Sequence, residues 1–273
     1  MSQELTIEAG HAERQYWKDL WRYRELFLIL TWRDVAVQYK QTVVGILWAV
    51  LRPLLTMAAF TIVFSKIAKL PAEGEAPYAL MVFAAMLPWQ LFATSLAATA
   101  NSLVINSNLV SKVYFPRVIV PTATLGVAIV DFAISFVLLC GMMCWYQYLP
   151  PIQVLMVFPL TLLAGLVALG PGLILCALNV TYRDFRIIVP FITQFGLYIS
   201  PVGFSSSIVP EKWHLLYECN PMVGVIDGFR WAILGTIDFP GRALLISSIC
   251  ALVFLLLGIK IFRRTERTFA DVI

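Results

Sequence analysis

The sequence predicts an all-α membrane protein with six transmembrane helices, and three observations support this. Apolar residues make up 60% of the 273 residues without counting glycine, whereas soluble domains reach about 45–50% with glycine included. Charged residues make up only 13%, about half the usual share. Six separate segments are long and apolar enough for a spanning helix, which needs about 20 residues. A soluble fold of this length could not bury so much apolar surface.

The predicted spans divide the chain into three parts. Residues 1–42 form a cytoplasmic N-terminal segment, residues 43–262 the transmembrane domain, and residues 263–273 a cytoplasmic tail. The fourth span carries no charge, and the fifth is the weakest because it is short and interrupted by two prolines. The six spans are expected at Val43–Phe64, Pro77–Thr99, Val118–Trp145, Ile152–Leu178, Ile187–Phe204 and Ala243–Phe262.

Basic residues predict the orientation, because cytoplasmic loops of membrane proteins are enriched in Lys and Arg. Fourteen basic residues lie before the first span, in the second and fourth loops and after the last span, whereas five lie on the opposite side. We therefore expect both termini in the cytoplasm. Arg52 and Asp131 lie inside spans, where charges are costly. We expect them to pair or to line a shared hydrated path; the alternative is that Arg52 snorkels and Asp131 caps a turn.

Residues Glu13–Leu30 predict an amphipathic helix, because apolar side chains recur there at steps of three and four. A basic, Trp-bearing helix of this kind is typical of the cytoplasmic membrane surface. The alternative is an ordinary helix packed on protein. The apolar stripe consists of Tyr16, Leu20, Tyr23, Phe27 and Leu30.

Residues Met222–Leu234 form an apolar stretch between the fifth and sixth spans, interrupted by an acidic and a basic residue. It is too short and too charged to span a bilayer, so we predict a re-entrant or interfacial hairpin on the outside. The Asn220-Pro221 pair is expected to break or cap the chain before it.

Signals for catalysis and metal binding are weak in this sequence. The two histidines, His11 and His214, lie far apart, and the five cysteines show no Cys-x-x-Cys spacing. No phosphate-binding loop is found, since Gly165 and Gly170 are followed by Pro171-Gly172 inside an apolar span, which indicates a kink or close packing. A net charge of +4 is too small to indicate nucleic acid. We therefore expect a chain that is not an enzyme, binds no cofactor or metal itself and takes its energy from elsewhere.

Short motifs occur in a fixed order at the loops and span entries of this chain. They are Arg33-Asp34 with Tyr39-Lys40, Lys112-Val113-Tyr114-Phe115-Pro116-Arg117, Asn179-Val180-Thr181-Tyr182-Arg183-Asp184, Ser200-Pro201-Val202, Asn220-Pro221, and Arg230 with Gly235. Their order and spacing resemble the permease subunit of a type 2 ATP-binding-cassette exporter, in the polysaccharide branch that handles O-antigen, capsule and teichoic acid. The resemblance covers the chain from about Arg22 onward. Val118 departs from the resemblance, because an acidic residue is expected at this position. An ion pair that such an acid would form is therefore not expected in this chain.

The resemblance implies a homodimer in a bacterial inner membrane, whose two copies enclose a path for a lipid-linked polysaccharide, O-antigen above all. It implies two copies of a separate cytoplasmic ATPase subunit, which binds ATP and Mg²⁺. Membrane lipids are the other expected partners, and nucleic acid is not. The alternatives are an exporter of a drug or small lipid, a membrane glycosyltransferase acting on polyprenyl phosphate, and a non-catalytic scaffold.

The resemblance and the position in the chain together suggest roles for individual residues, with loop capping or membrane anchoring as the alternative. The residues expected to couple to the ATPase are Trp17, Trp21, Lys112, Tyr114, Phe115 and Arg117. The residues expected to shape the inner mouth are Tyr182, Arg183 and Asp184. The residues expected at the outer gate are Pro201, Asn220, Pro221, Arg230 and Trp231. The aromatic residues expected to face a lumen are Trp48, Phe195 and Tyr198.

Overall fold

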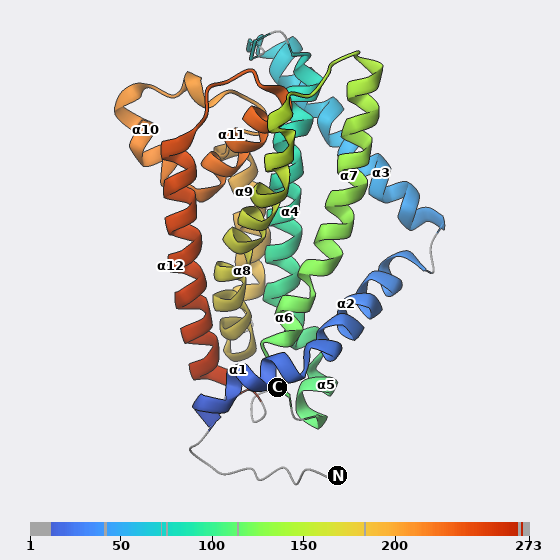
Figure 1. Ribbon diagram of the computed structural model, residues 1–273, viewed down its shortest axis with the longest axis vertical. Coiled ribbons are helices and arrows are strands. Elements are labelled where there is room, and N and C mark those ends of the chain that lie inside the picture. Colours follow the sequence, from blue (N-terminus) through green and yellow to red (C-terminus); the bar gives the residue numbers. More distant parts are fainter. Residues whose placement is uncertain are drawn as a thin grey trace.

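The computed structural model describes residues 12–40, 43–71, 73–74, 76–113, 115–182, 184–266 and 269, and every regular element in these ranges is a helix (Figure 1). The prediction of an all-α protein is therefore confirmed. In chain order the helices are α1 (Ala12–Arg22), α2 (Arg24–Tyr39), α3 (Val43–Phe60), η1 (Thr61–Ile67), α4 (Tyr78–Ile105), α5 (Ser107–Lys112), α6 (Ile119–Ala123), α7 (Leu125–Trp145), η2 (Ile152–Met156), α8 (Val157–Thr181), α9 (Phe185–Ile199), η3 (Ser206–Ile208), α10 (Glu211–Glu218), α11 (Pro221–Leu234) and α12 (Gly241–Glu266).

Five segments in the described ranges are long and apolar enough to cross a bilayer, and each overlaps one of the predicted spans. They are α3 continued by η1, α4, α6 continued by α7, η2 continued by α8, and α12. Helix α1 and the C-terminal end of α12 lie at one end of the molecule, which we call the α1 end (Figure 1). Helices α10 and α11 lie at the opposite end, which we call the α11 end.

Helix α4 forms the centre of the bundle, because 78% of its most apolar window is buried, against 33% or less in the other four segments. It packs against α7, α8, α9 and α11. The outer helices keep apolar side chains exposed, as Leu245, Leu252 and Leu256 of α12 show. Such faces are expected on helices that contact lipid or another protein in a membrane.

Helices α8 and α12 cross closely at two glycines. A Cβ atom on Gly170 would lie 2.6 Å from the carbonyl carbon of Phe254, and one on Gly258 would lie 2.5 Å from the carbonyl oxygen of Gly170. Small residues allow this close approach of two membrane helices. The close-packing interpretation of Gly170 is therefore confirmed, and α12 is held along α8.

Helix α9 is shorter than the span predicted at Ile187–Phe204. It covers 15 residues, or about 22 Å of helix, whereas the hydrocarbon core is about 30 Å thick. The helix ends because Pro201 disfavours a helical backbone at the residue before it, and Ser200 is extended with φ −80° and ψ 152°. Helix α9 nevertheless runs lengthwise beside α4 and α8 (Figure 1).

The segment predicted as one amphipathic helix is divided into α1 and α2, which meet at Tyr23. Its apolar stripe packs against an apolar cluster at the α1 end of the bundle, as in the protein-packed alternative. A second apolar face points away from the bundle, with side chains between 62% and 73% exposed. This second face consists of Trp21, Leu28, Ile29 and Trp32.

Helices α10 and α11 lie in the segment for which the sequence predicts a hairpin, and α11 packs against α4, α8 and α12. The backbone of α11 lies against α12, since a Cβ atom on Gly224 would lie 2.3 Å from the carbonyl oxygen of Ala243. The helix begins with Pro221 at its first turn and ends at Gly235, whose φ of 64° is left-handed. Helix α11 is therefore an interior element at the α11 end of the bundle.

Candidate functional site

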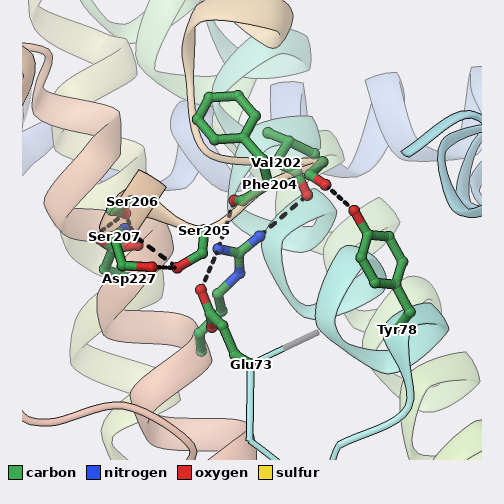
Figure 2. Close-up of polar contacts among 10 residues, drawn as sticks. Glu73, Tyr78, Val202, Phe204, Ser205, Ser206, Ser207 and Asp227 are labelled. Atoms are coloured by element: carbon green, nitrogen blue, oxygen red, sulfur yellow. Dashed lines mark hydrogen bonds and ion pairs between the residues drawn. The ribbon is translucent and has the colours of Figure 1, made fainter. Parts of the chain in front are cut away.

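A buried ion pair at the α11 end joins three segments that are distant in the sequence (Figure 2). Arg230 of α11 is fully buried, and its Nη1 atom lies 3.1 Å from Oε1 of Glu73. The same Nη1 donates to the carbonyl oxygen of Phe204 at 2.9 Å, and Nη2 donates to that of Val202 at 3.2 Å. The guanidinium therefore holds the loop before α4 and the loop after α9 against α11.

The loop after α9 is also fixed by Tyr78 at the beginning of α4. The Tyr78 hydroxyl donates a hydrogen bond to the carbonyl oxygen of Gly203 (Figure 2). Gly203 has no space for a side chain, because a Cβ atom there would lie 2.6 Å from the ring of Phe64. Three consecutive carbonyl groups of an irregular loop are thus satisfied by buried side chains, as buried backbone groups require.

Asp227 lies one turn before Arg230 on α11 and binds the loop from the other side. Its two carboxylate oxygens accept a hydrogen bond from the Ser206 hydroxyl, at 2.6 and 2.5 Å (Figure 2). Burial raises the pKa of Asp227 to about 6, against the opposing effects of the Ser206 hydrogen bond and the Arg230 charge. This carboxyl group therefore changes its protonation state in mildly acidic solution.

Helix α10 is tied to the beginning of α12 by a bidentate ion pair. Nε and Nη2 of Arg242 each lie 2.8 Å from a carboxylate oxygen of Glu218. The Asn220 side chain accepts a hydrogen bond from the Met222 amide at 3.1 Å and donates one to Ser200 at 2.9 Å. Asn220 therefore caps α11, as expected for this residue type.

All five residues expected at the outer gate lie in this region. Pro201 is buried in the loop after α9, Pro221 begins α11, and the Trp231 ring packs edge-on against Phe239 with centroids 4.9 Å apart. They lie along α11 and in the loop after α9, to which Asn220 and Arg230 both bond. Their role as a gate stays a prediction.

A second polar cluster at the α1 end joins the loop before α6 to the end of α12. The Arg117 amide donates to Oε1 of Glu266 at 2.7 Å, and its Nη1 atom donates to the Glu266 carbonyl oxygen at 2.6 Å. Arg263 lies over the ring of Tyr16 in α1, 4.6 Å from its centroid. Helix α1, the loop before α6 and the end of α12 therefore meet in one place.

The residues expected to couple to an ATPase differ in their exposure. Lys112 and Trp21 are exposed. Phe115 is only 4% exposed and belongs to the apolar cluster at the α1 end, and its part in coupling stays a prediction. Tyr114 lies outside the described residues, and Trp17 lies in α1 with a side chain outside the described set.

The residues expected at the inner mouth lie between α8 and α9. Tyr182 is exposed, and its ring lies 6.2 Å from that of Phe185, centroid to centroid. Asp184 is exposed at the start of α9. Arg183 lies outside the described residues. The loop therefore presents polar groups at the α1 end, and its role stays a prediction.

The structure does not bring Arg52 to Asp131. The carboxylate of Asp131 on α7 accepts hydrogen bonds from the hydroxyl of Tyr39 and from the amide of Gln38, at the end of α2. Arg52 is exposed on α3. The expected pairing is therefore not found, and this carboxylate ties α2 to α7. A hydrated path shared by Arg52 and Asp131 stays a prediction.

The aromatic residues expected to face a lumen are all exposed. Trp48 lies on α3, whereas Phe195 and Tyr198 lie on α9. Phe195 pairs with Phe191 at 4.3 Å between centroids, and Tyr198 stacks on Phe60 of α3 at 6.4 Å. One face of α9 thus carries a row of exposed aromatic side chains, and its surroundings in the membrane stay a prediction.

The partners of the predicted residues were missed from the sequence, because each lies far away along the chain. Glu73 lies in the loop before α4, 157 residues before Arg230, and Glu266 follows Arg117 by 149 residues. A buried arginine requires a carboxylate, so Arg230 indicated that a partner exists without indicating which one. In the described part of the chain no group of three His, Cys, Asp or Glu side chains could hold a metal ion.

Comparison with known proteins identifies similar sequences. A family model described as ABC-2 type transporter matches residues 25–234. The O-antigen export system permease protein RfbA of Klebsiella pneumoniae is 25% identical over 252 residues, which cover 91% of this chain and 95% of that protein. The protein of the same name from Myxococcus xanthus is 27% identical over 216 residues, 78% of this chain and 82% of the relative. The inner membrane transport permease YadH of Escherichia coli (strain K12) is 33% identical over 60 residues, 22% of this chain and 23% of that protein.

Proposed function

The chain belongs to the ABC-2 type transporter family, and we propose that it is the membrane subunit of an exporter that moves a lipid-linked polysaccharide, O-antigen above all, across the bacterial inner membrane. The observation that carries this proposal is the extent of the similarity. Relatives named as O-antigen export permeases match 78% to 91% of the chain, whereas the YadH match covers 60 residues.

The proposal takes α9 as a sixth crossing, shorter than the other five. With six crossings, α1 and the end of α12 lie on the same side of the membrane, in agreement with their position at one end of the molecule (Figure 1). Lys112, Arg117 and Arg263 lie at this end, and basic residues favour the cytoplasmic side. The hairpin of α10 and α11 then lies at the outer side.

The path for the glycan is formed in this proposal between two copies of the chain. The exposed aromatic face of α9, with Phe195 and Tyr198, and Trp48 on α3 supply flat apolar rings. Such rings suit the C–H faces of sugars, because both surfaces are amphipathic. A row of aromatic side chains therefore gives a polysaccharide a wall along which successive units can slide.

Energy comes in this proposal from a cytoplasmic ATPase subunit, present twice, which binds ATP and Mg²⁺. The exposed side chains of Lys112 and Trp21 at the α1 end are available for contact with it. Movement of the loop that contains Lys112 reaches α12 through the hydrogen bonds between Arg117 and Glu266. The structural element that connects the ATPase to the outer hairpin is therefore α12, which contacts α10 at its other end through Arg242.

Co-purification followed by a transport assay tests this function. A tagged chain is isolated from its native membranes and is expected to bring a cytoplasmic ATPase with it. Inside-out vesicles with the pair are expected to take up lipid-linked glycan only with hydrolysable ATP, and deletion of the chain is expected to trap glycan in the cytoplasm. Normal surface glycan after deletion would indicate another cargo, and sugar transfer by the purified chain alone would indicate a glycosyltransferase.

A further inference from the structure

A cavity of about 460 Å³ lies at the α11 end, outside the elements that form the proposed path. It lies between α10, α11, the beginning of α12 and the loop that carries Ser205, Ser206 and Ser207. Cavities of about 300–1,000 Å³ are typical of small-ligand sites. The position on the outer hairpin places this cavity where an exported molecule leaves the membrane.

The polar lining of the cavity combines carboxyl groups with the side chains of Ser205, Ser206, Ser207, His214 and Arg242. Four carboxyl groups line it, and two of them are neutralised, because Glu73 pairs with Arg230 and Glu218 with Arg242. Asp227 and Asp238 have no ion pair in the described part of the chain. An anionic ligand would be repelled by the two remaining carboxylates. Three or more potential metal ligands do not converge among the described side chains, so the lining favours an uncharged ligand with several hydroxyl donors.

One acceptor in this cavity is left without a partner. Glu73 bonds to Arg230 through Oε1 only, and its Oε2 atom is buried with no hydrogen bond among the described residues. The Glu73 side chain is only 8% exposed, and it lines the cavity. A buried carboxylate oxygen without a donor is unfavourable. This oxygen has almost no exposed surface, so it accepts from a ligand hydroxyl only if the Glu73 side chain moves toward the cavity.

An aromatic ring completes the lining. Phe239 is 61% exposed, lines the cavity and is held edge-on by Trp231, with ring centroids 4.9 Å apart. A ring fixed by a neighbour offers a flat apolar surface at little cost in conformational entropy. Carboxylates that accept from hydroxyl groups beside a flat aromatic surface are the chemistry that recognises a sugar ring.

We propose that this cavity is a docking site for one neutral sugar unit of the glycan at the outer side of the membrane. The inference rests on the proposed function, because it takes the glycan as the exported molecule and the α11 end as the outer side. Sugar hydroxyls donate to Asp227 and to Asp238, and the sugar C–H face packs on Phe239. The site is a second binding site, which the glycan reaches after it has passed the aromatic face of α9.

Saturation-transfer NMR on the full chain in lipid nanodiscs tests this site. The probe is a set of fragments of two to six sugars, released by mild acid from the surface polysaccharide of the producing strain. Phe239→Ala and Asp238→Asn change exposed residues of the lining, so their folding is expected to be unaffected. Glu211→Gln removes an exposed carboxylate from α10 outside the lining and is the matched control.

We expect saturation transfer to the fragments with the unmodified chain and with Glu211→Gln, and an affinity lowered roughly tenfold in the two lining variants. No transfer with the unmodified chain, or equal affinity in all four proteins, overturns the site. Trapping of glycan in a deletion strain is measured in parallel. If deletion traps glycan while the lining variants bind as before, the docking site is wrong and the export function stands; if deletion traps none, the export function itself fails.

Discussion

The guanidinium of Arg230 and the carboxylate of Glu73 form an ion pair, 3.1 Å from Nη1 to Oε1, with no exposed surface on the arginine side chain. Arg230 also donates to two loop carbonyl groups. Removing one partner of a buried pair leaves the other charge without compensation, which costs about 3–5 kcal/mol. The pair therefore decides whether three segments of the α11 end stay together.

Replacement Arg230→Ala is expected to lower the free energy of unfolding by about 3–5 kcal/mol, and Glu73→Gln by less, because the amide still accepts a hydrogen bond. Thermal unfolding of the purified chain in nanodiscs measures both. Arg242→Ala, which breaks a pair with an exposed arginine side chain, is the control and is expected to have a small effect. Equal unfolding temperatures for Arg230→Ala and Arg242→Ala would show that burial of the first pair does not matter.

Asp227 gives the chain a pH-dependent stability. Its pKa is raised to about 6 by burial, above about 3.9 in an unfolded chain. The folded state therefore binds the proton more tightly, so the stabilising contribution is complete below about pH 4 and is lost as the pH rises through 6. The difference between the two pKa values corresponds to a free energy on the order of 3 kcal/mol.

Unfolding temperatures measured between pH 4 and pH 8 check this effect. The unmodified chain is expected to lose stability toward neutral pH, and Asp227→Asn is expected to remove most of that slope. Asp238→Asn changes an exposed carboxyl group of the same region and is expected to leave the slope as it is. A slope unchanged in Asp227→Asn would assign the pH dependence to other groups.

Helix positions could be predicted from the sequence because length and hydropathy are local properties. Five predicted spans overlap the long apolar helices of the structure, and even the short α9 was signalled by Pro201, which ends it. The packed face of α1 and α2 was also visible as a stripe. Its surroundings were not, because a stripe of apolar residues packs equally well on protein or at a membrane surface.

The polar contacts of the candidate site could not be predicted, because they depend on the fold. Asp131 was assigned to Arg52 from depth in the membrane, but α2 ends beside α7 and supplies Tyr39 and Gln38 instead. Phe115 lies in a motif that resembles a cytoplasmic docking loop, yet its ring is buried. A motif indicates that a segment has a function and does not indicate which side chains of the segment face outward.

The hydrogen bonds between Arg117 and Glu266 are expected to transmit movement from the loop before α6 to α12. Arg117→Ala and Glu266→Ala are each expected to lower export severalfold while ATP hydrolysis by the partner continues. Each single variant keeps one of the two bonds, because Arg117→Ala retains the backbone amide and Glu266→Ala retains the backbone carbonyl. The double variant removes both bonds and is therefore expected to lower export more than either single one. The measurement is the amount of glycan taken up per ATP hydrolysed, with both determined in the same inside-out vesicles.

Two further variants are needed to interpret this test. Lys112→Ala, on the exposed side of the same region, is expected to weaken binding of the ATPase rather than transmission. Phe115→Asp would bury a charge in the apolar cluster and reduce folding, so loss of export in that variant says nothing about coupling. Unchanged export in the Arg117 and Glu266 double variant would argue against transmission through this contact.

The exposed face of α9 is expected to lie opposite a second copy of the chain. In a background without the five native cysteines, Phe195→Cys is expected to form cross-linked dimers in native membranes when a short bifunctional thiol reagent is added. Leu252→Cys on α12 is the control, because that position is similarly exposed but lies on a helix outside the proposed path. Cross-linking at Phe195 alone supports a path between two α9 faces, because only residues near the dimer axis approach their own copies. Cross-linking at Leu252 alone would place α12 at the interface and leave the aromatic row of α9 toward lipid.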